Sequence, residues 1–290
     1  MGQGRKKSKG FERRESRRVA AVDLRHKRKK EEKAKGIISN RQPSTIDQLR
    51  VEDETMIRDE HDEELVQDDN LDEFSPILSG TIEPKVMITT TRDPNRFTKR
   101  LAKELRNVVP NAVYRKRGAY SLNSVITSCT QHSYTTIILI EQGQERKRPD
   151  GLWIAGLPNG PTAHFRIGKV LYKNELEMSG KSTNHFPELN LHGFKTRLGH
   201  RIGRMFQSVF PPRPDLEGRQ LVTFHNQRDW IFFRRHRFIL EDFKTARLQE
   251  LGPRISLHLL TLQQGAFSRH SQYEYLPRVN LNRDKRQFFL

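Results

Sequence analysis

The sequence has little that could cross a membrane or build a cysteine framework. Its longest apolar run, Ile137–Ile140, is far shorter than the ~20 residues that a membrane-spanning helix needs. The single cysteine, Cys129, excludes an internal disulfide bond and a cysteine-based zinc or iron–sulfur site. Residues 1–7 lack the apolar core of a secretory signal. We therefore expect a soluble, intracellular protein.

Motifs of the common catalytic classes are also missing. Gly168-Lys169 is followed by Val170 and lacks the spacing of a phosphate-binding loop, and H-E-x-x-H, G-x-S-x-G and G-x-G-x-x-G do not occur. The histidines between 185 and 236 show no metal-ligand spacing, and Cys129 has the apolar neighbours of a structural thiol. A metal-dependent nuclease built from scattered carboxylates has no support in these spacings. No enzyme activity, metal or cofactor is predicted.

Positive charge is what the chain has in excess, because 53 Lys and Arg face 35 Asp and Glu. Residues 1–41 hold 16 basic and 5 acidic residues, a balance of +11. Residues 42–73 hold 2 basic and 13 acidic residues, or −11, whereas residues 84–290 hold 35 and 16, or +19. Charge of this sign suits contact with nucleic-acid phosphates.

The first two blocks contain almost no aromatic residues and cannot bury enough apolar surface to offset chain entropy. We expect disorder or an isolated solvated helix here. Residues 1–41 are predicted as a basic tail, disordered or helical on binding, and residues 42–83 as an acidic linker. The basic run 25–30 is either a nuclear import signal, a phosphate-binding arm or a solvated charge run. The acidic block is a spacer, a competitor for the basic surface or a docking strip for a basic protein.

From Pro84 onward the pattern changes to alternating strands and helices. Apolar and β-branched runs predict strands over 85–91, 136–140, 151–155 and 162–167. Helical spacing and start signals predict helices over 97–109 and 121–130. This order indicates an α/β fold.

The second half repeats these features. Phe194-Lys195-Thr196-Arg197-Leu198 echoes residues 97–101, and each opens a helix that ends before a proline. Gly252-Pro253, followed by an alternating strand, echoes Gly160-Pro161. The offsets of 97 and 92 residues are close, so we predict an internal duplication of about ninety residues whose halves, about 84–172 and 186–267, share a core.

The helix of the second half carries a basic stripe. Arg197, Arg201 and Arg204 lie at i, i+4 and i+7, opposite an apolar face, and span about 10 Å. No acidic residue at i±4 neutralises them locally, which favours phosphate binding over a merely solvated face.

A hairpin follows this helix, with a strand to Phe224, a turn over 225–229 and a second strand from Trp230. Its interleaved basic and aromatic residues suit RNA, although at least two of Trp230, Phe232 and Phe233 are expected in the core. The predicted RNA contacts of this segment are Arg219, Gln227, Arg228, Arg234, Arg235 and Arg237.

Three stretches resemble the signature segments of the Brix-domain family of ribosome-assembly proteins. They are Ile88–Arg92, Leu157–Phe165 and Gly203–Phe206. Within that family, the longer stretch Thr196–Phe206, followed by residues 219–220 and 223–229, resembles one branch in particular. The resemblance covers about 84–267, which is predicted as the Brix domain, with 268–290 as a C-terminal extension.

The resemblance implies two similar α/β halves, each similar to the anticodon-binding domain of class II aminoacyl-tRNA synthetases. It implies a non-enzymatic nuclear and nucleolar factor that binds precursor rRNA during assembly of the large (60S) subunit. It also implies a heterodimer with a second, zinc-binding assembly factor, and it places RNA binding on the arginine helix and the hairpin. A small-subunit factor and a protein–protein scaffold remain as alternatives.

Overall fold

The computed structural model describes residues 44–57, 63–143, 148–242, 245–268, 271–277 and 286–290, with six isolated positions between 20 and 31. The chain divides into two units, residues 1–49 and 50–290. In the first unit, the Leu49 N–H donates to the Thr45 carbonyl and closes a turn. The predicted basic tail, 1–41, lies outside the described residues except at those six positions.

The second unit contains five α-helices, two 3-10 helices (Lys173–Glu175 and Leu216–Gly218) and eleven strands among its described residues. The helices are α2 (Glu63–Leu71), α3 (Ser75–Leu78), α4 (Arg96–Val108), α5 (Leu122–Gln131) and α6 (Arg197–Gln207). The strands are β1 (Val86–Thr90), β2 (Ala112–Tyr114), β3 (Thr136–Gln142), β4 (Pro149–Gly156), β5 (Thr162–Leu171), β6 (Glu188–His192), β7 (Gln220–Gln227), β8 (Trp230–Asp242), β9 (Thr245–Glu250), β10 (Arg254–Gln263) and β11 (Tyr273–Tyr275). Every strand and helix predicted between 85 and 167 is confirmed. None of the described helices is long and apolar enough to span a bilayer.

Local sequence signals explain where the first two long helices begin. The Asn95 side chain accepts a hydrogen bond from the Thr98 N–H at 2.8 Å, and the Ser121 hydroxyl accepts one from the Ser124 N–H at 3.1 Å. Each cap satisfies a backbone donor that the first helical turn leaves unpaired.

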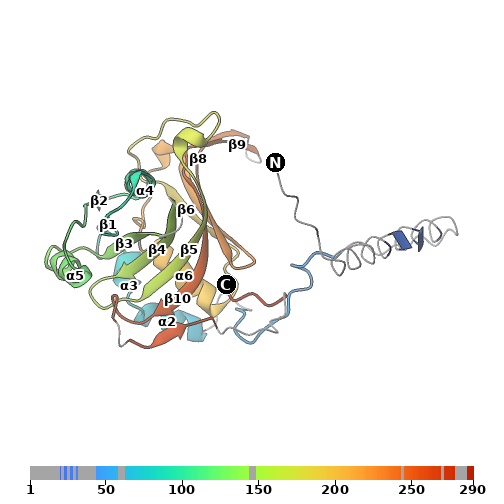
Figure 1. Ribbon diagram of the computed structural model, residues 1–290, viewed down its shortest axis with the longest axis horizontal. Coiled ribbons are helices and arrows are strands. Elements are labelled where there is room, and N and C mark those ends of the chain that lie inside the picture. Colours follow the sequence, from blue (N-terminus) through green and yellow to red (C-terminus); the bar gives the residue numbers. More distant parts are fainter. Residues whose placement is uncertain are drawn as a thin grey trace, which may run out of the picture. The chain divides into compact units, whose positions relative to one another are not determined.

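All strands belong to one mixed sheet, in the order β2-β1-β3-β4-β5-β10-β8-β7-β6, with β11 beside β10 and β9 beside β8 (Figure 1). β1 runs parallel to β2 and β3, and β6 runs parallel to β7. The remaining pairs are antiparallel.

The sheet order shows the two similar halves. The series β1–α4–β3–β4–β5 corresponds to β6–α6–β7–β8–β10, and the halves meet where β5 pairs antiparallel with β10. The first half alone inserts β2 and α5, and the second alone inserts β9. The predicted α/β fold of two similar halves is confirmed, whereas the boundaries 84–172 and 186–267 stay predictions.

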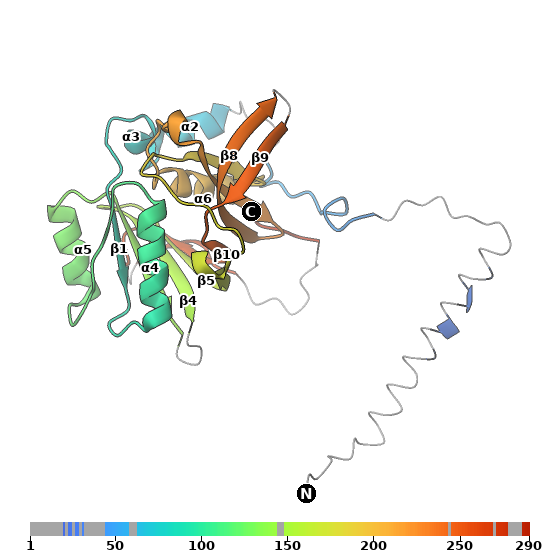
Figure 2. The ribbon, with the colours of Figure 1, turned by 90° about the horizontal axis from the view of Figure 1, so that it is seen from above.

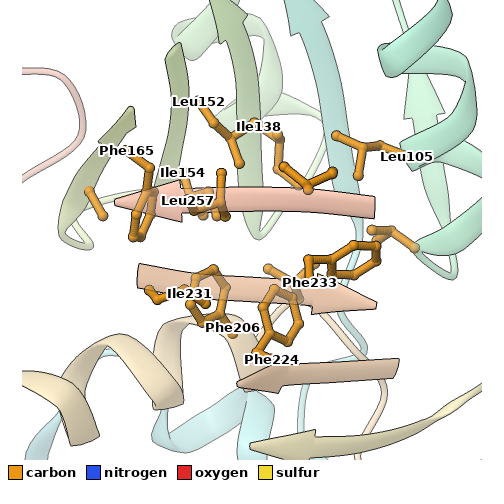
Figure 3. Packing of buried hydrophobic residues seen from close by; sticks show 14 of the residues in the cluster. Leu105, Ile138, Leu152, Ile154, Phe165, Phe206, Phe224, Ile231, Phe233 and Leu257 are labelled. Carbon is orange, nitrogen blue, oxygen red and sulfur yellow. The ribbon is translucent and has the colours of Figure 1, made fainter. Parts of the chain in front are cut away.

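The two halves share one hydrophobic core, as the sequence predicts. Figure 3 shows Leu105 of α4 and Phe206 of α6 near residues of both halves of the sheet, among them Ile138 and Ile231. Burial of this apolar surface is the main favourable term in folding.

The other face of the first half is covered by α5, so α4 and α5 lie on opposite sides of β1 (Figure 2). Cys129 of α5 packs there with Met87 and Ile137. Burial raises the pKa of its thiol, which fits the structural role predicted for it.

The acidic segment differs from the expectation of disorder or an isolated solvated helix. Its residues 63–73 form α2 and the approach to α3, and the adjoining Phe74 and Ile77 are buried. Phe74 belongs to the main core cluster, so this aromatic residue anchors the segment on the folded unit.

Residues 286–290 pack beside the start of α6. One Asp229 carboxylate oxygen accepts the N–H groups of Phe289 at 2.7 Å and Leu290 at 3.0 Å. The Thr196 hydroxyl, which caps α6, donates to the Phe289 carbonyl at 2.6 Å. Arg50 donates to the carbonyls of Phe288 and Leu290, both at 3.2 Å. The helix start is thereby held by residues distant in sequence.

Candidate nucleic-acid interface

Helix α6 presents the predicted arginine stripe because its other face is apolar. Ile202, Met205 and Phe206 are almost fully buried, whereas Arg197 is exposed. The amphipathic pattern therefore turns the arginines away from the shared core, as the sequence predicts.

Two residues of the acidic segment, Glu64 and Asp72, pair with the arginines at the two ends of this stripe. Arg197 contacts Glu64 at 2.7 Å, in a pair whose side chains are 52% and 74% exposed. The Arg204 Nε donates to Asp72 at 2.5 Å, and these side chains are only 13% and 7% exposed. The second pair is nearly shielded from water, so its charges interact more strongly than those of the first.

Arg201 occupies the middle of the stripe and joins three segments. It contacts Glu73, which precedes α3, at 3.0 Å and Glu274 of β11 at 3.1 Å. Burial alone would lower the pKa of this guanidinium, but its hydrogen bonds with Glu274 and Glu73 outweigh burial and raise the pKa. Asp69 adds a further contact to the same face, 2.9 Å from His200.

The absence of local acidic partners, which the sequence shows, does not leave Arg201 and Arg204 without negative charge beside them. No acidic partner lies within the helix, but partners 73 to 132 residues away in sequence supply the negative charge. Only Arg197 keeps a half-exposed side chain. In this structure the stripe forms an internal ion-pair cluster with Glu64, Asp72 and Glu73, which holds this part of the acidic segment against α6.

The β7–β8 hairpin turns more tightly than predicted. Only Arg228 and Asp229 lie between the strands, and their φ angles of 56° and 62° suit the twist of a two-residue turn. The alternation along β8 is confirmed, because Ile231 and Phe233 point inward while Phe232 is partly exposed.

Arg235 lies on the inward face and is only 3% exposed. Its guanidinium donates to the Asn107 carbonyl at 3.0 Å and to the Gln220 side-chain oxygen at 2.5 Å. Burial lowers its pKa to about 10. The predicted RNA contact is therefore corrected: Arg235 links the end of α4 to the hairpin from inside the protein.

Of the three hairpin aromatics, Phe233 alone is fully buried. Trp230 is 37% exposed and packs over β5, where a Cβ at Gly168 would lie 2.5 Å from its ring. Arg234 lies over the Phe232 ring, 5.8 Å from its centroid. The expectation that at least two of the three belong to the core is wrong, because only Phe233 is buried.

The remaining predicted contacts lie at two ends of the hairpin. Arg219 and Arg237 are exposed at one end, where Gln220 pairs with Arg237. Gln227 and Arg228 are exposed at the turn, and strand geometry puts about 24 Å between the two ends. Arg234 lies partly buried between them. The structure thus separates the predicted contacts rather than gathering them.

Three histidines of the folded unit have lowered pKa values and predict a pH-dependent stability. Burial lowers the pKa of His225, and the neighbouring His192, 2.9 Å away between Nδ1 atoms, lowers it further. Burial also lowers the pKa of His164 and His236. The folded state then binds fewer protons than the unfolded chain. We expect the free energy of unfolding to be retained above pH ~6.5, the ordinary histidine pKa, and to fall as pH drops below it.

Urea unfolding between pH 8 and 5.5 measures this dependence above the range in which carboxylates titrate. The variant His225→Gln should lose less stability over the same interval than the parent chain. Stability that rises on acidification would contradict the assignment.

One more group of residues escaped the sequence reasoning. The described residues contain no cluster of His, Cys, Asp and Glu suited to a metal ion. They do contain a second basic surface, formed around the start of α5 by Arg92, Arg115, Lys116 and Arg117, which line two adjoining hollows. The basic tripeptide 115–117 is the sequence signal that could have found it.

Comparison with known proteins gives consistent matches. The family model described as Brix domain matches residues 91–261. The protein named Ribosome production factor 1 from Pongo abelii is 45% identical over 252 residues, which are 86% of this chain and 71% of that protein. The protein of that name from Saccharomyces cerevisiae is 35% identical over 273 residues, or 92% of this chain and 89% of that protein. A crystal structure of a probable ribosomal biogenesis protein from Aeropyrum pernix K1 aligns with a TM-score of 0.46 and 15% identity, over 60% of this chain and 96% of that one.

Proposed function

Because this chain belongs to the Brix-domain family and is a ribosome biogenesis factor, we propose that it binds precursor rRNA during assembly of the large (60S) subunit. It acts there in the nucleolus as a non-catalytic component of the pre-60S ribonucleoprotein. It stabilises one RNA conformation and positions a protein partner relative to that RNA until later factors displace it.

The excess positive charge of residues 84–290, +19 before the acidic segment is counted, is the observation that supports RNA binding. Phosphate contacts made by Lys and Arg release counterions, so the affinity should depend steeply on salt. RNA shape and partner contacts supply the specificity.

The exposed predicted residues are the ones we assign to RNA. They are Arg197, Arg219, Gln227, Arg228 and Arg237, with the partly exposed Arg234. Arg201 and Arg204 can meet phosphates only where these replace the acidic side chains that now pair with them. Arg235 supports the same surface from inside.

We also propose that this chain forms a heterodimer with a second, zinc-binding assembly factor. The basic tail and the C-terminal extension are proposed to anchor neighbouring pre-60S proteins. The acidic segment contributes less to such contacts than its charge suggests, because part of that charge is already paired with α6.

Ultraviolet crosslinking in cells, followed by sequencing of the RNA recovered with the protein, tests this function. We expect reads concentrated at a few positions of large-subunit rRNA, since a positioned factor contacts defined sites. Reads in small-subunit rRNA would overturn the subunit assignment. Recovery equal to an uncrosslinked control, repeated with 4-thiouridine-labelled RNA, would favour a protein–protein scaffold instead.

A further inference from the structure

Two adjoining hollows lie around the start of α5. The first has a volume of about 810 Å³ and is lined by Arg92, Arg117, the first turn of α5 and residues 266–268. The second, of about 530 Å³, is lined by Arg115, Lys116 and Arg117 together with residues of β1 and α5. Arg117 belongs to both, so the hollows form one continuous basic surface.

The charge of this surface has no local counterpart. Neither hollow has an Asp or Glu in its lining, and among the described residues no ion pair engages Arg92, Arg115, Lys116 or Arg117. Burial and the nearby charge of Arg92 lower the pKa of Arg117, as expected where two guanidinium groups repel each other. The contrast with α6 is direct, because there acidic side chains neutralise the arginines.

The backbone holds these side chains in place. The Arg115 N–H donates to the Ile88 carbonyl at 3.0 Å, and the Thr89 hydroxyl donates to the Arg115 carbonyl at 3.0 Å. The Arg117 Nε donates to the Tyr120 carbonyl at 3.1 Å. The first turn of α5, which lines the larger hollow, adds the partial positive charge of a helix N-terminus.

Aromatic side chains border the charge. Tyr120 lines the second hollow and is 72% exposed, and Phe267 lines the first. An exposed ring beside a basic groove is the arrangement on which single-stranded nucleic acids stack their bases while the phosphates meet the charge.

We propose that these two hollows bind a single-stranded segment of RNA, with phosphates at Arg92, Arg115, Lys116 and Arg117 and a base stacked on Tyr120. This inference rests on the proposed RNA-binding function and locates a contact outside α6 and the hairpin.

The test measures binding of a fluorescent 12-nucleotide oligouridine by the full chain at several salt concentrations. The variant R92A/R115A/K116A should bind at least tenfold more weakly. Its dependence of log Kd on log salt should be shallower by about 2, since each single-strand phosphate contact contributes about 0.7. The matched control K99A/K103A/R106A removes three exposed charges from α4 and should bind within twofold of the parent chain.

A second pair of variants tests the stacking without risk to the core. Tyr120→Ala should weaken binding about fivefold or more, whereas Tyr120→Phe keeps the ring and should bind like the parent. Both triple variants and both tyrosine variants retain residues 1–41, so differences among them do not come from the basic tail.

The outcomes separate this site from the broader function. Equal losses in the two triple variants, or unchanged binding by R92A/R115A/K116A, would overturn the site and leave RNA binding in place. A parent chain without affinity for RNA would overturn the RNA-binding function and this site with it.

Discussion

Replacing Phe206 by alanine is expected to lower the free energy of unfolding by about 3–5 kcal/mol, because the ring lies where the two halves share their core. Phe206 is 1% exposed, stacks on Phe224 at 4.2 Å between centroids, and lies 5.5 Å from the Phe165 ring (Figure 3). Truncation leaves a cavity bordered by strands of both halves. Thermal unfolding should show a fall in Tm of about 10 °C.

The control for this variant is Phe232→Ala, the same change on the outward side of β8. It should cost less than half as much, since its ring is already partly exposed. A loss below about 1 kcal/mol for Phe206→Ala would contradict a core that depends on both halves, because the site would then collapse without a lasting cavity.

Asp72→Ala is expected to cost about 3 kcal/mol, the second large effect. One carboxylate oxygen accepts the N–H groups of Phe74 at 2.8 Å and Ser75 at 2.9 Å, in the turn that leads into α3. The other accepts the Arg204 Nε. Removing the carboxylate leaves two backbone donors and a nearly buried guanidinium without this partner.

A double-mutant cycle with Arg204→Ala isolates the ion pair, and we expect a coupling of about 1–3 kcal/mol from chemical unfolding. The matched control is Glu64→Ala, whose exposed pair with Arg197 should contribute less than about 1 kcal/mol. If both acidic variants have equally small effects, the segment is a solvated spacer after all.

The ion pairs of Asp72 and Glu64 also affect how charge reversal of the arginine stripe would be interpreted. R197E/R201E/R204E removes RNA contacts and the ion pairs of the acidic segment together, so its loss of RNA binding would be ambiguous. Arg197→Glu alone changes the half-exposed member and leaves the pairs of Arg201 and Arg204 intact. It is the cleaner test of α6 as an RNA surface.

Local patterns predicted the elements of the fold because their causes are local. Asn95 and Ser121 cap helices within three residues of themselves, and the apolar spacing of α4 and α6 sets which face is buried. The duplication was visible because Gly160-Pro161 and Gly252-Pro253 precede β5 and β10, the two strands that pair at the centre of the sheet.

The candidate site was less predictable because its partners come from distant segments. Nothing near Arg201 in sequence indicates that Glu73 and Glu274 will reach it, and composition alone suggested a solvated acidic block. Arg235 occupies an inward position in the alternation of β8. A strand pattern does not show, however, that the Gln220 side chain and the Asn107 carbonyl accept hydrogen bonds from its guanidinium. The sequence therefore located the basic elements without showing which charges are neutralised.

The contacts of residues 50–51 with 286–290 join segments that lie more than 230 residues apart in the sequence. The Val51 N–H donates to the Arg286 carbonyl at 3.1 Å, and the Arg50 side chain reaches the Leu290 carbonyl. Closing so long a loop costs chain entropy before the contacts at its ends can compensate for that cost. We therefore expect these contacts to form late in folding. On a ribosome that synthesises the chain from its N-terminus, α6 emerges before Glu274 and Phe289 exist. Its arginine face and its first turn thus stay incomplete until the last residues of the folded unit are made.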